Sequence, residues 1–164
     1  MAKRIIKWKL TQRGHENYCR GLEIHKRLNS LNHEGIVDLV ATFEDNEAFY
    51  LIMEKLDADL ITLVERRRRV PEPEARAVFK KVVNIVSFIH KNNVSHRDLK
   101  PDNFLINFCK TGQCVVNVKL TDFELAADLS DKKEFSIFCG SHAYAGILCF
   151  SSLCHQYLLF FLTI

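Results

Sequence analysis

The sequence predicts an α+β fold in which a small β-rich part precedes a part dominated by helix. Two apolar stretches rich in β-branched residues, separated by the polar turn 44–47, predict a β-hairpin over residues 36–53. Apolar residues recur at i, i+3, i+4 and i+7 between residues 75 and 89, which predicts a long amphipathic helix with one buried face. A second strand pair, 103–108 and 114–120, is expected after that helix.

Composition excludes several classes of protein. The chain has 164 residues, of which 48% are apolar and 26% charged, so it is not a disordered chain, a collagen-like repeat or a coiled coil. This length suits one domain, or one and a fraction, and is enough to bury a core. The formal net charge of +3 is too small to indicate a nucleic-acid partner from bulk charge.

Two further helices are expected in the first half of the chain. The apolar residues of 17–32 fall near helical spacing, and His33-Glu34-Gly35 ends that pattern. A shorter helix over 57–69 closes with the basic run 66–69, which we interpret as a solvated helix end, with a nuclear-import or partner-binding patch as the alternative. Pro73 stands where the long amphipathic helix can start.

The six cysteines have no CxxC or other metal-binding spacing. The first ten residues also lack the continuous apolar segment of a secretory signal. Both observations favour free thiols in an intracellular protein, either cytoplasmic or nuclear.

The segment His96-Arg97-Asp98-Leu99-Lys100-Pro101-Asp102-Asn103 carries the strongest chemical signal. Within six residues it supplies a carboxylate at Asp98, an ammonium at Lys100 and an amide at Asn103. Asp122, after the second strand of the pair, adds another carboxylate. Phosphoryl transfer needs a carboxylate to accept the hydroxyl proton, cations to neutralise the moving phosphate, and oxygen ligands for Mg²⁺.

At these residues the chain resembles the eukaryotic protein kinase family. The run 96–103 resembles the family's catalytic loop, HRDxxxxN, and Asp122-Phe123-Glu124 resembles its metal-binding DFG. Lys100 is the residue that the serine/threonine branch carries. The resemblance implies transfer of the ATP γ-phosphate to protein Ser/Thr hydroxyls, with ATP and Mg²⁺ as cofactors. Asp98 is then the base, Lys100 steadies the γ-phosphate, and Asn103 and Asp122 hold the metal.

The resemblance extends over residues 1–145 and implies further ATP-site residues. Residues 2–5 resemble the end of the family's VAIK strand, so Lys3 is expected on the α/β-phosphates and Glu23 as its helix partner. The backbone of Glu54 and Leu56 is expected at adenine. The other matches are the gatekeeper, the apolar residue beneath adenine and two members of the apolar spine: Met53, Leu105, His96 and Phe123.

By this resemblance the chain is part of a two-lobed kinase fold. Residues 1–56 correspond to part of the small β-rich lobe, 57–145 to an incomplete helical lobe, and 146–164 to an apolar tail. The stretches 43–46 and 71–76 look most like the cell-cycle and calmodulin-dependent kinase groups. Cys139-Gly140-Ser141 and Tyr144 resemble the end of an activation segment.

The chain departs from the family pattern in several places. We expect it to begin at the VAIK strand, without the glycine-rich phosphate loop. If Leu28 is the spine residue, the usual spacing places Ile24 rather than Glu23 opposite Lys3. Glu124 replaces a glycine next to the metal ligand, and a side chain there disfavours positive φ. Ile137 stands at the usual phosphorylation position, with Ser136 beside it.

The tail has three open interpretations. Residues 135–164 contain no Asp, Glu, Lys or Arg, and the last 18 residues are largely apolar. They are a frame-shifted or non-coding extension, a membrane anchor that just reaches the length of a span, or a packed terminal helix. Any membrane contact is therefore expected only through 147–164.

Two functions compete with an active kinase. One is a non-catalytic kinase-like scaffold, which the departures near the phosphates and at Glu124 favour. The other is a membrane-tethered fragment, which depends on the tail alone. The expected partners are a protein substrate and ATP, with no nucleic acid.

Overall fold

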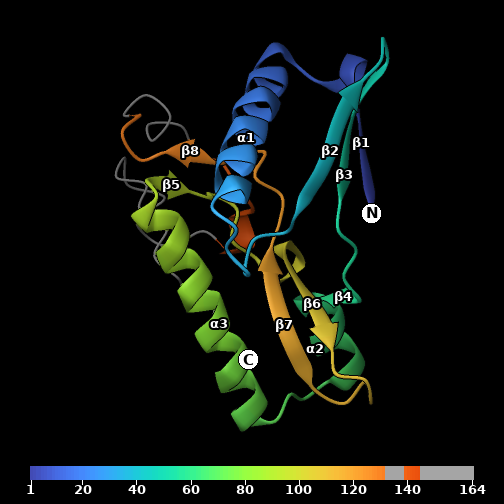
Figure 1. Ribbon diagram of the computed structural model, residues 1–164, viewed down its shortest axis with the longest axis vertical. Coiled ribbons are helices and arrows are strands. Elements are labelled where there is room, and N and C mark those ends of the chain that lie inside the picture. Colours follow the sequence, from blue (N-terminus) through green and yellow to red (C-terminus); the bar gives the residue numbers. More distant parts are fainter. Residues whose placement is uncertain (132–138, 145–164) are drawn as a thin grey trace.

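The computed structural model describes residues 1–131 and 139–144, and it confirms the α+β class. Figure 1 shows α1 beside one small sheet in the upper half, and α2 and α3 on either side of the strands β6 and β7 below. The helices and strands are β1 (Ala2–Ile6), α1 (Gln12–Ser30), β2 (Leu39–Glu44), β3 (Ala48–Met53), β4 (Ala58–Asp59), α2 (Leu60–Arg67), α3 (Glu72–Lys91), β5 (Val94–Ser95), β6 (Phe104–Phe108), β7 (Val115–Leu120) and β8 (Ala127–Asp128). Short 3₁₀ helices cover Lys7–Lys9, Pro101–Asn103 and His142–Tyr144.

The upper sheet contains the predicted hairpin. Its strands run in the order β1-β3-β2, all antiparallel, and Lys3 of β1 lies opposite Leu51 of β3. β2 begins three residues later than the apolar pattern predicted. Ile36 instead forms a parallel bridge with Leu120 of β7, and the N–H of Val37 donates to the Leu120 carbonyl at 3.0 Å. This bridge joins the chain after α1 to the end of the lower strand pair.

Helix α1 begins five residues before the predicted helix. The side chain of Thr11 accepts a hydrogen bond from the Gly14 N–H at 3.1 Å and so caps the first turn. The residues that α1 buries are Tyr18, Gly21, Ile24, His25 and Leu28, which recur at three- and four-residue intervals. One face of α1 therefore packs inward along most of its length.

The lower sheet has the order β4-β6-β7 and contains the second predicted strand pair. The helix predicted over 57–69 is shorter in the structure because its first residues form β4, which pairs with β6. Asp59 then caps α2 by accepting a hydrogen bond from the Thr62 N–H at 2.7 Å. At the other end, Arg68 adopts a left-handed conformation, with φ of 55°, and α2 stops.

The long amphipathic helix is confirmed as α3. Pro73 lies in its first turn, where the missing N–H removes no helical hydrogen bond. Its buried residues are Val78, Val82, Ile85, Val86 and Ile89, and they join the larger of two hydrophobic clusters. That cluster also includes Ile24 and Leu28 of α1, so α1 helps to bury the core beneath the lower sheet.

Some sequence-based expectations fall outside the described residues: those for Ser136, for Ile137 and for the tail 146–164. Within 1–131 and 139–144, no helix combines the length and the apolar character needed to cross a bilayer.

Candidate active site

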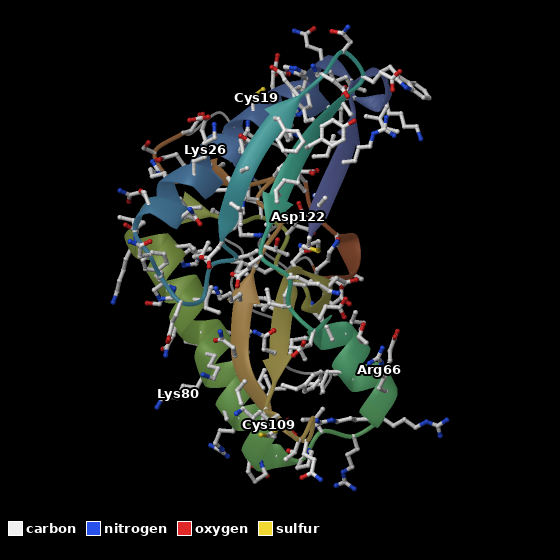
Figure 2. The ribbon with its side chains drawn as sticks, turned by 45° about the vertical axis from the view of Figure 1, so that its right-hand side comes forward. Cys19, Lys26, Arg66, Lys80, Cys109 and Asp122 are labelled. Carbon is white, nitrogen blue, oxygen red and sulfur yellow. The ribbon has the colours of Figure 1, made fainter. Side chains whose placement is uncertain are left out.

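Several of the predicted site residues lie between the upper sheet and the lower sheet. Asp122 follows β7, and Figure 2 shows it at the junction between the upper strands and the lower pair. The loop 96–103 lies between β5 and β6. The N–H of Thr121 donates to the Asn103 carbonyl at 3.0 Å, and His96 Nε2 donates to the Thr121 carbonyl at 2.9 Å. These bonds hold the loop and the Asp122 segment together.

His96 organises the loop as a neutral imidazole. Its side chain is only 1% exposed, and this burial holds its pKa below the ordinary value despite the bond to Thr121. Because Nε2 donates to a carbonyl, Nδ1 is free to accept, and the Asp98 N–H lies 3.4 Å from it. His96 thus fixes the backbone of Asp98 directly.

Asp98 lies at the centre of a small polar cluster. Its Oδ2 is 3.0 Å from Lys100 Nζ and 3.2 Å from Asn103 Nδ2, while its Oδ1 accepts the Ser141 N–H at 2.8 Å. Burial alone would raise the pKa of Asp98, but hydrogen bonds from Ser141 and Lys100 outweigh it and lower the pKa below the usual range. The carboxylate is therefore ionised at neutral pH.

Ser141 brings a hydroxyl group to this carboxylate and ammonium pair. Its Oγ accepts a hydrogen bond from Lys100 Nζ at 3.1 Å. The sequence identified Ser141 only as part of a segment end, because nothing local connects it with residues about forty positions earlier. Ser141 therefore places a hydroxyl oxygen beside both Asp98 and Lys100, the groups that a reacting hydroxyl would have to contact.

Lys3 reaches the same region from β1. Its Nζ lies 3.0 Å from Asp122 Oδ1 and 2.6 Å from Glu124 Oε1. Burial would lower the pKa of Lys3, but the charges of Asp122 and Glu124 together raise it. The side chains of Lys3, Asp122 and Glu124 are all about one third or more exposed, so water partly screens both ion pairs.

The structure corrects the expected partner of Lys3. Glu23 is 73% exposed and forms an ion pair with Lys26 at 3.1 Å, so the predicted Lys3–Glu23 contact is absent. Ile24, the alternative position, is buried in the larger core. A small pocket beside Lys3 is lined by the α1 residues Tyr18, Gly21, Leu22 and His25, none of which is acidic. Glu124 provides the carboxylate instead.

The glycine at position 21 of α1 explains how Glu124 can lie so close to Lys3. A Cβ at Gly21 would lie 2.3 Å from the Phe123 carbonyl oxygen and 2.8 Å from the Glu124 Cα. Without that carbon, α1 packs directly on the backbone after Asp122. The Phe123 ring contacts two imidazoles, with ring centroids 4.9 Å from His25 and 5.1 Å from His96.

The segment after Asp122 is held at several points. Arg97 Nε donates to the Leu125 carbonyl at 2.6 Å, and Arg20 Nε donates to the Ala126 carbonyl at 2.9 Å. Asp122 itself has φ of 64° and Arg97 has φ of 62°, in the left-handed region that most residues avoid. A residue keeps such an unfavourable backbone conformation only where the surrounding contacts hold it there. Residues of this kind concentrate at functional sites.

The residues expected around adenine also lie together. Met53 and Leu56 are buried in the cluster beneath the upper sheet, and Leu105 packs against it. The N–H of Glu54 donates to the Asp38 carbonyl at 3.0 Å, and the Glu54 carboxylate contacts Lys119. These contacts fix the backbone between β3 and β4.

The oxygens at this site fit Mg²⁺. Asn103 uses its amide nitrogen in bonds to Asp98, so its Oδ1 is directed away from that partner, and Asp122 adds a carboxylate. Mg²⁺ is commonly held by one or two protein oxygens together with phosphate and water. Within 1–131 and 139–144, no cluster of three or more His, Cys, Asp and Glu side chains could enclose a metal alone.

Comparison with known proteins agrees with this geometry. A family model described as the protein kinase domain matches residues 1–146. The chain is 34% identical over 118 residues to the probable serine/threonine-protein kinase fhkD of Dictyostelium discoideum, which covers 71% of this chain and 16% of that protein. It is 37% identical over 130 residues to serine/threonine-protein kinase RAD53 of Saccharomyces cerevisiae, covering 79% of this chain and 15% of that protein.

A human relative gives the same result. The chain is 37% identical over 119 residues to human NUAK family SNF1-like kinase 1, covering 72% of this chain and 17% of that protein. The chain therefore corresponds to less than one fifth of the length of each of these relatives. The match over residues 1–146 shows that the chain belongs to the protein kinase domain family.

Proposed function

We propose that this chain carries the phosphate-transfer centre of a serine/threonine protein kinase, which moves the γ-phosphoryl group of ATP to a protein hydroxyl. The observation that carries the proposal is the contact of Asp98 with Lys100 and Asn103, together with the backbone bond from Thr121 to Asn103 that ties the neighbouring Asp122 to the same loop. Each of these side chains has the chemical character that phosphoryl transfer requires. The relatives named as serine/threonine kinases support the choice of acceptor.

Asp98 acts as the base in this proposal. Its lowered pKa keeps it ionised at neutral pH, so it can accept the proton of an incoming hydroxyl group. Lys100, 3.0 Å from the same carboxylate, supplies positive charge where the transferred phosphoryl group would pass. Asn103 holds Asp98 in place by donating to its carbonyl at 2.8 Å.

The remaining residues bind the nucleotide. Lys3 is suited to the α/β-phosphates, and the backbone of Glu54 and Leu56, with Leu105 beneath, is suited to adenine. Asn103 and Asp122 would hold Mg²⁺, which when bound neutralises charge that develops on the phosphates. Residues 1–56 and 57–145 are then parts of the two lobes, with the nucleotide between them.

Replacing Asp98 with asparagine tests the proposal. Phosphate transfer from labelled ATP to a serine peptide is expected to fall by at least about 100-fold, since a positioned base contributes roughly 10²–10⁴-fold. Asp102→Asn is the matched control, because it makes the same charge change on an exposed residue of the same loop. Equal rates for the two variants would contradict the assignment of Asp98.

A non-catalytic scaffold is the second candidate. It is favoured by one observation: Lys3 is held by Asp122 and Glu124, both from the segment that should face the metal. The same assay separates the two functions. A chain that binds Mg-ATP in a titration but transfers no phosphate, with or without Asp98, is a scaffold.

Glu124 is expected to keep Lys3 in position for the phosphates, in place of a helix carboxylate. In Glu124→Gln, Lys3 retains Asp122 as its charged partner among the described residues and competes with Mg²⁺ for it. ATP affinity, measured by calorimetry with excess Mg²⁺, should fall by roughly 3- to 10-fold, since exchanging a charged for a neutral hydrogen-bond partner costs on the order of 1 kcal/mol.

Glu23→Gln is the control for Glu124→Gln. It makes the same chemical change on α1, where Glu23 is exposed and pairs only with Lys26 among the ion pairs of the described residues. Its ATP affinity should equal that of the unmodified chain. The opposite pattern, a loss in Glu23→Gln and none in Glu124→Gln, would restore Glu23 as the partner of Lys3.

A further inference from the structure

Two cysteines face each other at the end of the β6–β7 hairpin. Cys109 directly follows β6, Cys114 directly precedes β7, and the turn 110–113 lies between them. The N–H of Cys109 donates to the Cys114 carbonyl at 2.9 Å. Figure 2 shows Cys109 at the far end of the lower sheet from Asp122, so this pair is separate from the candidate active site.

Several hydrogen-bond donors surround the Cys109 sulfur. The Cys114 N–H lies 3.3 Å from it, the Thr111 hydroxyl oxygen lies 3.1 Å from it, and the Cys114 thiol also donates to it. These hydrogen bonds, that of the Cys114 thiol first, lower the pKa of Cys109 to about 6. The same bond raises the pKa of Cys114. At neutral pH the pair is therefore one thiolate and one thiol.

The hairpin holds both sulfurs in an accessible place. Cys114 is exposed and Cys109 is partly exposed. Arg67 Nη2 donates to the Gln113 carbonyl at 2.8 Å, and Glu74 Oε1 accepts the Val115 N–H at 3.2 Å. The turn is thus tied to α2 and α3. Facing residues of antiparallel strands are typically about 4.5–5.5 Å apart at Cα, within the range that a disulfide spans.

We propose that Cys109 and Cys114 form a peroxide-reactive thiol pair that closes into an intramolecular disulfide. In the first step the Cys109 thiolate attacks one oxygen of hydrogen peroxide. An S–O bond forms, the O–O bond breaks, and hydroxide leaves and takes up a proton as water. Cys109 is oxidised to the sulfenic acid and the peroxide is reduced.

In the second step the Cys114 sulfur attacks the sulfenic sulfur of Cys109. The S–S bond forms, the S–O bond breaks, and the leaving hydroxide combines with the Cys114 proton as water. Two thiols and one hydrogen peroxide therefore give one disulfide and two waters. Cys109 is the attacking residue and Cys114 the resolving residue because their hydrogen bond stabilises the thiolate on Cys109.

Peptide mapping of the reduced full chain after peroxide treatment at pH 7 tests the proposal. The expected product joins the peptides that contain Cys109 and Cys114, with the loss of two hydrogens. In Cys114→Ser the reaction should stop at a sulfenic acid on Cys109, which dimedone traps. A disulfide between two chains, or a Cys109 that oxidises no faster than Cys19, would overturn the proposal.

The pH dependence of alkylation gives an independent test. Iodoacetamide should modify Cys109 with a midpoint near pH 6. Thr111→Val removes one donor to the sulfur and should move that midpoint upward, while Cys19→Ser on α1 should leave it unchanged. An unshifted midpoint in Thr111→Val, or a wild-type midpoint in the ordinary range above pH 8, would show that the hairpin does not activate Cys109.

Discussion

Asp122→Asn is expected to abolish Mg²⁺-dependent ATP binding. Asp122 lies 3.0 Å from Lys3, and its segment is joined to Asn103 through the Thr121 backbone, so its carboxylate lies near the other proposed metal ligand. Asparagine keeps the shape and removes the charge that attracts the metal. Changes in the groups that merely support metal ligands typically cost 10–100-fold in affinity, so loss of a charged ligand should cost at least about 100-fold.

Thermal unfolding in the presence of ligand measures this effect. Ligand at 100 times its Kd stabilises a protein by about 2.7 kcal/mol, so a 100-fold loss of affinity reduces the stabilisation to about 0.4 kcal/mol. EDTA should remove the stabilisation of the unmodified chain. Asp102→Asn, which removes an exposed carboxylate from the neighbouring loop, should retain it. A magnesium-dependent shift that persists in Asp122→Asn would contradict the proposed metal site.

Gly21→Ala is expected to destabilise the protein by roughly 1–3 kcal/mol, as overpacking of a close contact does. This effect is opposite to the usual result, since alanine in a helix interior is about 1 kcal/mol more favourable than glycine. The added methyl group would lie 2.3 Å from the Phe123 carbonyl oxygen. That atom belongs to the backbone, so α1 and the segment after Asp122 have to move apart.

Gly14→Ala in the same helix is the matched control. Its Cβ would lie 3.4 Å from the side chains of Leu10 and Thr11, which is ordinary van der Waals contact. Urea unfolding should therefore show Gly14→Ala equal to or more stable than the unmodified chain, and Gly21→Ala less stable. Equal stabilities would mean that α1 does not press on the Phe123 backbone.

Gly21→Ala also connects packing with the candidate site. Displacing α1 moves Phe123 and Glu124, and Glu124 is a partner of Lys3. We therefore expect weaker ATP binding in Gly21→Ala than in Gly14→Ala, even at a temperature where both are folded.

Local patterns were sufficient to predict most of the elements. The apolar spacing of 75–89 predicted α3, and the two strand pairs followed from β-branched residues on either side of polar turns. The start of α1 was missed because residues 12–16 are polar and have no apolar period. There, the hydrogen bond between Thr11 and Gly14 defines the first turn.

The candidate site also has a part that local sequence predicted and a part that it did not. The spacing within 96–103 is local, so the sequence was enough to predict that Asp98, Lys100 and Asn103 act together, and the structure brings them within hydrogen-bonding distance. The partner of Lys3 depended on the rotation of α1, and one residue turns a helix by about 100°. Because the sequence left the position of α1 uncertain by one residue, it could not exclude Glu23 as the partner of Lys3.

By itself, the sequence determined most of the α+β elements, the candidate loop 96–103 and the protein kinase family, because these depend on residue types at short and regular spacing. The tertiary structure alone decided the contacts between distant segments: Ser141 beside Asp98, and Glu124 beside Lys3. The physical reason for the second contact is the packing of Gly21 against the Phe123 backbone. No local pattern encodes such a close approach, since it requires two surfaces that meet only after folding.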